Sequence, residues 1–224
     1  MALVLDFVQG NTLSPTFAGF FNRQTQEMLL KPLMTNLHGY KSVDINGHVD
    51  SALATTFTAK KDKYTRLFKE KNIQEACIGW QDTVYEMDNL LQSSSWPNLI
   101  RLGSDEFVSQ IAPLYFLMQL NIAHIQIGNM QDFAFGSEIL AEGALLSAVR
   151  SMKPGFWKSD YKYKPSVQHL AKLRYRYAMY MRLDENPEGA DRALTYIDAA
   201  IRLQPGNVAL MRERENIRAW IQQL

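Results

Sequence analysis

The sequence is short of cysteine, of long apolar runs and of any large excess of charge. Cys77 is the single cysteine in 224 residues and no Asn-x-Ser/Thr acceptor occurs, which excludes an internal disulfide framework and N-glycosylation. No apolar run approaches the roughly eighteen residues that a membrane-spanning helix needs. Residues 1–6 also lack the basic start of a signal peptide. We therefore expect a cytoplasmic protein that meets a membrane only through a partner.

Residues that usually build catalytic or metal centres are also sparse. The histidines are scattered without metal-ligand spacing: His38, His48, His124 and His169. Neither a Gly-rich phosphate loop nor a nucleophile elbow occurs. Cys77 lies on a predicted packed helix, where an inert thiol is expected, and Glu86 and Asp88 point to different sides of that helix. These absences predict a protein that is not an enzyme and holds no metal or cofactor.

Charge is unevenly distributed along the chain. The formal net charge is +1, but residues 150–176 carry eight Lys and Arg residues against one Asp. This segment is therefore +7 and the remainder of the chain is −6. A segregated basic region on a nearly neutral chain favours an acidic partner.

The most regular spacing lies near the C-terminus. Ala193, Ile197, Ala200 and Pro205 follow the pattern A-x3-hydrophobic-x2-A-x4-P. Two small residues let helices lie close together, the large apolar residue fills the groove between them, and proline ends the helix. Residues 208–224 predict a closing helix whose apolar side covers the exposed edge of the preceding pair.

The rest of the chain divides into an N-terminal extension, residues 1–50, and a helical domain, residues 51–224. In the extension, Ser14 and Pro15 predict the start of a helix over residues 15–36, whose apolar side needs a partner surface, either the first helix pair or another protein. Residues 3–5 fit a short strand. Residues 44–47 fit a hairpin turn or, as we favour, a loop.

The helical domain predicts three helix pairs, over residues 52–92, 107–150 and 167–205. The expected helices cover residues 52–71, 73–91, 107–127, 130–149 and 167–183, then the regular helix that ends before Pro205. A turn is expected at Gly128 and Asn129, and the Pro- and Gly-containing residues 152–166 predict a loop insertion. In the first pair, Ala76, Trp80 and Thr83 match the C-terminal spacing, but Tyr64 stands where a small residue is expected.

These patterns resemble the tetratricopeptide repeat, whose signature ends in A-x3-F and P. The resemblance covers residues 56–224 and is strongest in the third pair. It includes a Trp-containing linker, Ser95-Trp96-Pro97, like that of several chaperone-binding members. Those members are the immunophilin-type and aryl-hydrocarbon-receptor-interacting co-chaperones and the tetratricopeptide subunit of the fungal post-translational translocation complex. It implies an all-α solenoid of three irregular repeats that binds other proteins.

Chaperone-binding members hold the carboxylates of an acidic peptide in a clamp on their concave face. The resemblance places that clamp at Lys61, Thr65, Gln119, Lys172 and Arg176, with Thr65 and Gln119 standing where asparagine is usual. It implies an adaptor for an acidic peptide such as a heat-shock chaperone C-terminus. Two alternatives remain: a solvated basic helix face without a ligand, and a structural subunit of a fixed assembly with a vestigial or self-filled groove.

The insertion carries four aromatic residues among four lysines: Phe156, Trp157, Tyr161 and Tyr163. The default expectation is that these rings pack back onto the surface of the protein. A partner-binding loop is the next interpretation, because Trp and Tyr dominate interface hot spots. Nucleic-acid or membrane binding fits the same composition and is less favoured.

Overall fold

The computed structural model describes residues 49–132 and 134–224, which belong to one compact unit, Gly47–Leu224. Every regular element among these residues is a helix and none is a strand, which confirms the predicted all-α class. The helix predicted over residues 15–36, the strand at 3–5 and the turn at 44–47 lie outside the described residues.

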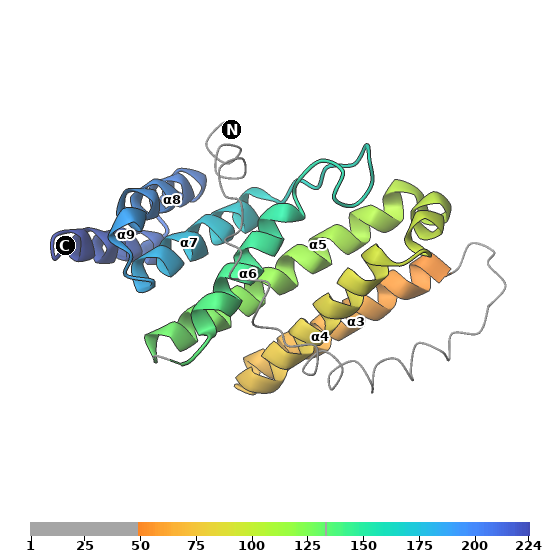
Figure 1. The fold of residues 1–224 in the computed structure, drawn as a ribbon, viewed down its shortest axis with the longest axis horizontal. Helices are drawn as coiled ribbons and strands as arrows, with labels where there is room; N and C mark the ends of the chain where they lie inside the picture. Colours follow the sequence, from red (N-terminus) through yellow and green to blue (C-terminus); the bar gives the residue numbers. More distant parts are fainter. Residues whose placement is uncertain (1–48, 133) are drawn as a thin grey trace, which may run out of the picture. The chain divides into compact units, whose positions relative to one another are not determined.

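The helices pack in a repeating order (Figure 1). They are α3 (Val49–Lys69), α4 (Ile73–Gln92), α5 (Trp96–Gln131), α6 (Ser137–Arg150), α7 (Val167–Leu183), the 3-10 turn η2 (Pro187–Gly189), α8 (Ala190–Leu203) and α9 (Val208–Ile221). Each α-helix packs against the next one in the chain, and α3, α5, α7 and α9 also pack in series. This places three helix pairs, α3/α4, α5/α6 and α7/α8, beside one another.

Helices α3 and α5 run in the same direction (Figure 1). Ala54 and Pro113 line one groove between them, and further along both helices the ring of Phe68 meets the ring of His124, with centroids 6.1 Å apart. Residue numbers therefore rise together along the two helices. The first helices of the first two pairs are thus parallel neighbours, and each forms part of one face.

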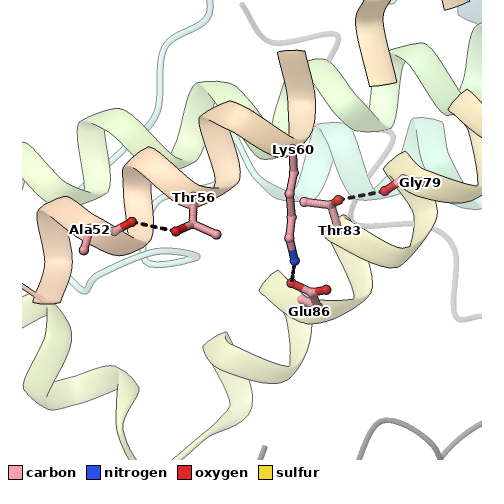
Figure 2. Close-up of polar contacts among 6 residues, drawn as sticks. All are labelled: Ala52, Thr56, Lys60, Gly79, Thr83 and Glu86. Carbon is pink, nitrogen blue, oxygen red and sulfur yellow. Dashed lines mark hydrogen bonds and ion pairs between the residues drawn. The ribbon is translucent and has the colours of Figure 1, made fainter. Parts of the chain in front are cut away.

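The two helices of the first pair lie close together because a small residue stands on the second helix, α4. A side chain at Gly79 of α4 would collide with the ring of Tyr64 on α3. The small residue expected at position 64 is therefore supplied by the opposite helix, which explains the poor match of the first pair. Figure 2 shows the polar contacts of the same pair: Lys60 of α3 forms an ion pair with Glu86 of α4, and the Thr83 hydroxyl donates to the Gly79 carbonyl at 2.7 Å.

The second pair differs from the prediction at three boundaries. Helix α5 begins at Trp96 and not near residue 107, because a proline in the first helical turn, here Pro97, needs no N–H partner. Gly128, predicted as a turn, lies inside α5. The break comes at Gly136, whose φ of 78° is a left-handed conformation that glycine adopts without strain. As a result α6 begins at Ser137 instead of residue 130.

The third pair agrees closely with the sequence. Helix α7 covers the predicted residues 167–183, and the Ser166 side chain caps it by accepting from the backbone N–H of His169 at 3.2 Å. Ala193, Ile197 and Ala200 of α8 are buried, as their spacing predicts. Helix α9 ends at Ile221, a few residues before the predicted end.

Residues 152–166 form the predicted loop, and their aromatic side chains belong to the core. Trp157 is 1% exposed, Tyr163 is buried, and Phe156 and Tyr161 pack against the core from its edge. Trp157 stacks edge-on against Tyr115 of α5, with ring centroids 5.5 Å apart. The loop therefore packs back onto the protein, which was the default expectation.

Candidate functional site

The middle of helix α5 is buried on every side except one narrow stripe. Between Ile111 and Gly128, the residues that are not buried are Pro113, Leu117, Asn121, His124 and Gly128. They are spaced by three or four residues, so they follow one face of the helix. We call these five residues the α5 stripe. It is the accessible face of the central helix of the described unit.

A groove of about 500 Å³ lies at one end of the α5 stripe, between α3 and α5. Its walls include Ala54, Thr58 and Asp62 from α3 and Ser109, Gln110 and Pro113 from α5. The wall side chains are small or polar, so a ligand backbone could approach the helices closely. Pro113 has no N–H to donate to the Ser109 carbonyl, which therefore loses its usual partner within the helix.

At the other end of the α5 stripe, His124 lies between Phe68 of α3 and Arg176 of α7. Its ring makes an edge contact with Phe68. Burial, and then the positive charge of Arg176, lower the pKa of His124 below its ordinary value of 6.5. His124 is therefore neutral at pH 7. The sequence predicts no role in a site for His124, and the structure leaves part of its side chain accessible on the α5 stripe.

Arg176 is the most unusual group on this face. Its side chain is half-buried, its Nη1 atom is fully buried, and no hydrogen-bond acceptor among the described residues reaches that atom. Burial lowers the pKa of Arg176 to about 10, so the guanidinium stays charged at pH 7. A buried cationic donor without an acceptor costs free energy that an incoming anion would recover.

The other predicted clamp residues are placed differently. Lys172 is exposed one helical turn before Arg176. Lys61 forms an ion pair with Asp62 at 2.8 Å, and the Thr65 hydroxyl donates to the Lys61 carbonyl at 2.7 Å. Both α3 residues are therefore already engaged in local contacts. Of the five, only Lys172 and Arg176 present cations without an ion-pair partner among the described residues.

The structure buries Gln119, which was predicted to bind the peptide, and leaves Asn121 on the accessible face instead. Gln119 is 5% exposed and contacts the hydroxyl of Tyr115, so its amide lies inside the core. Asn121, which the sequence reasoning did not select, lies on the α5 stripe three residues before His124. Asn121 and His124 are polar residues three positions apart, and this helical spacing was the signal in the sequence that could have identified Asn121. The amide donor of this face is therefore Asn121.

Other chemical centres are not found in the described residues. In residues 49–132 and 134–224 no group of His, Cys, Asp and Glu is arranged to hold a metal ion. Cys77 is buried and accepts from the Gln126 amide at 3.5 Å, and burial raises the pKa of its thiol. Within the same ranges no helix has both the length and the apolar character needed to cross a bilayer.

Comparison with known proteins gives no match for this chain, whether by family model, by curated sequence or by solved structure.

Proposed function

We propose that this chain is a non-catalytic adaptor of the tetratricopeptide type, which binds an acidic protein segment along the face formed by α3, α5 and α7. The packing order of the helices supports this, because each pair contacts the next through both of its helices. The parallel course of α3 and α5 supports it further, since parallel first helices form one continuous face.

The unpartnered Nη1 atom of Arg176 carries the proposal. A ligand carboxylate placed there accepts a charge-assisted hydrogen bond from a donor that is already desolvated. Lys172, exposed on the same side of α7, adds attraction without fixed geometry. His124 is neutral and can donate one N–H, and the Asn121 amide can pair with the ligand main chain.

The loop of residues 152–166 does not supply the ligand in this proposal. Its rings contact one another and Trp96, Tyr115 and Phe116, and none of these three belongs to the α5 stripe. This disfavours a groove filled by the chain's own insertion. The cytoplasmic location expected from the sequence fits an adaptor that meets soluble partners.

A peptide titration tests the proposal. The probe is a fluorescein-labelled acidic peptide with a free C-terminal carboxylate, and fluorescence anisotropy reports its Kd. Arg176→Met should weaken binding about 10- to 100-fold, since hydrogen bonds to charged groups contribute about 1.5–3 kcal/mol. Lys172→Met should have a smaller effect that disappears at high salt.

Two controls make the result specific. Arg101→Met removes one exposed arginine near the start of α5 and should leave Kd unchanged. The same peptide with an amidated C-terminus should bind more weakly to the parent protein and equally to Arg176→Met. Equal affinity of the parent and Arg176→Met for the free-acid peptide would overturn the proposal.

A further inference from the structure

Large apolar side chains are exposed where the chain enters α6. Phe135, Ile139 and Leu140 are 106%, 54% and 45% exposed. Single exposed apolar residues are common on soluble proteins, but three within six residues form a patch of the kind that marks interaction sites. The patch begins beside the left-handed Gly136, which turns the chain into α6.

Three carboxylates border this patch. Glu138 and Glu142 lie one turn apart on α6, with Ile139 between them on its outer surface, and Asp184 is the residue that ends α7. Helices α6 and α7 pack together, and the start of α6 lies near the end of α7 (Figure 1). We call Phe135, Glu138, Ile139, Glu142 and Asp184 the acidic corner.

The carboxylates of the acidic corner repel one another. Burial, then the charge of Asp184 and a hydrogen bond with it, raise the pKa of Glu138, and burial followed by the Asp184 charge raises the pKa of Glu142. No Lys or Arg of the described residues forms an ion pair with any of the three. Asp184 also lies at a helix C-terminus, where the helix dipole disfavours negative charge.

A buried hydroxyl group near these carboxylates also lacks a hydrogen-bond partner among the described residues. The side chain of Tyr177 on α7 is buried, and its hydroxyl has no hydrogen-bond partner among the described residues. The hydroxyl lies near enough to Glu142 for the carboxylate to contribute, after burial and Tyr196, to raising the pKa of Tyr177. The acidic corner therefore combines carboxylates that form no ion pair among the described residues with exposed apolar surface, and a buried hydroxyl without a hydrogen-bond partner lies near Glu142.

We propose that the acidic corner docks a partner protein through an amphipathic helix that carries Lys or Arg beside Leu-like side chains. The cations would neutralise Glu138, Glu142 and Asp184, and the apolar side chains would cover Ile139 and Phe135. The charge repels nucleic acid and anionic membranes, which excludes these as occupants. This surface goes beyond the Arg176 site, because it selects the opposite charge on different residues.

The experiment uses the full chain and a defined probe. The probe is a fluorescein-labelled synthetic peptide with Leu and Lys at helical spacing, and its partner probe has Glu in place of every Lys. Anisotropy should show binding of the Lys peptide alone. The variant Glu138→Gln/Glu142→Gln/Asp184→Asn should weaken that binding at least tenfold.

A charge-matched control and a stability readout accompany the binding data. Glu70→Gln/Asp191→Asn/Glu215→Gln removes three exposed carboxylates elsewhere and should change Kd less than twofold. The acidic-corner variant should also melt at a higher temperature than the parent, because it relieves repulsion. Arg176→Met should bind the Lys peptide normally, so failure of the Arg176 site and failure of this one are distinguishable.

Several outcomes would overturn the proposal. One is that both triple variants weaken binding of the Lys peptide equally, and another is that the Glu peptide binds as tightly as the Lys peptide. A third is that sedimentation shows salt-sensitive dimers of the chain that the acidic-corner variant abolishes and that the Lys peptide does not disrupt. If the triple variant fails to fold, Ile139→Ser decides, because this exposed position tolerates a polar residue. It should weaken the Lys peptide about fivefold, and an unchanged Kd would reject the docking surface.

Discussion

Arg182 donates to both oxygens of the Glu213 carboxylate, at 2.7 and 3.4 Å, and so ties α7 to α9. The Glu213 side chain is buried, and Asn216 donates to it as well, at 3.1 Å. Arg176, six residues earlier on the same helix, has a buried nitrogen with no such acceptor among the described residues. Of these two arginines on one helix, Arg182 is therefore paired with a buried carboxylate, whereas Arg176 has a buried nitrogen without an acceptor.

This contrast predicts opposite effects on stability. Arg182→Met should lower the free energy of unfolding by about 3–5 kcal/mol, because it leaves the Glu213 carboxylate buried and without its cation. Arg176→Met should leave the free energy of unfolding unchanged or raise it, since the methionine keeps the apolar stem and removes an uncompensated charge. Urea unfolding followed by circular dichroism measures both. A large loss in Arg176→Met would show that its guanidinium is satisfied within the fold.

Trp157 predicts a second stability effect. Its indole N–H donates to the Ser151 carbonyl at 2.8 Å, and its own carbonyl accepts from the indole N–H of Trp96 at 3.0 Å. Trp157→Ala should therefore lower the free energy of unfolding by about 3–5 kcal/mol. Lys162→Ala, at an exposed position of the same loop, should change it by less than about 0.5 kcal/mol. Similar urea midpoints for the two variants would contradict the packing described for this loop.

The contact between Gly79 and Tyr64 makes a third prediction. Gly79→Ala should destabilise the protein by about 1–3 kcal/mol, because its methyl group meets the Tyr64 ring. Gly143→Ala, on a helix position with open space around it, should instead stabilise it by about 0.5–1 kcal/mol. In a double-mutant cycle, Gly79→Ala should cost less in a Tyr64→Ala background. Additive effects would show that the ring is not the obstacle.

The pH dependence of stability tests the acidic corner. The folded-state pKa of Glu142 is raised, so its protonated form is favoured by folding and its stabilising contribution is lost as pH rises through the folded pKa. Glu142→Gln should therefore melt at a higher temperature than the parent at pH 7, and the difference should shrink towards pH 4. Glu70→Gln, which changes an exposed carboxylate, serves as the control in differential scanning calorimetry. A constant difference across this pH range would count against the raised pKa.

The sequence predicted those parts of the fold whose signals are local. The helix predicted over residues 167–183 coincides with α7, and the spacing of Ala193, Ile197 and Ala200 gave the buried side of α8. The error in α5 arose because glycine alone does not break a helix. Gly128 and Gly136 look alike in sequence, and only the path of the chain decides which one adopts a left-handed conformation.

The candidate site was harder to predict because it depends on which face of α5 is covered. Gln119 and Gln126 share the side directed into the core, whereas Asn121 and His124 share the accessible stripe. Both pairs have helical spacing, so periodicity groups the residues correctly but does not say which group faces solvent. The choice follows from where α4, α6 and α7 pack. The unpaired nitrogen of Arg176 likewise depends on neighbours distant in sequence.

Helix α5 runs unbroken from Trp96 to Gln131, which at the rise of an α-helix corresponds to about 54 Å. One end lies beside the anchored loop at Trp157, the groove with α3 lies along its course, and the turn into α6 leaves from its far end. Helices α6 and α7, which carry Glu138 and Arg176, both pack against this single continuous helix. An acidic segment held by Arg176 and a basic helix docked beside Glu138 would be kept at a set separation and orientation, so that joining two partners would also fix their geometry.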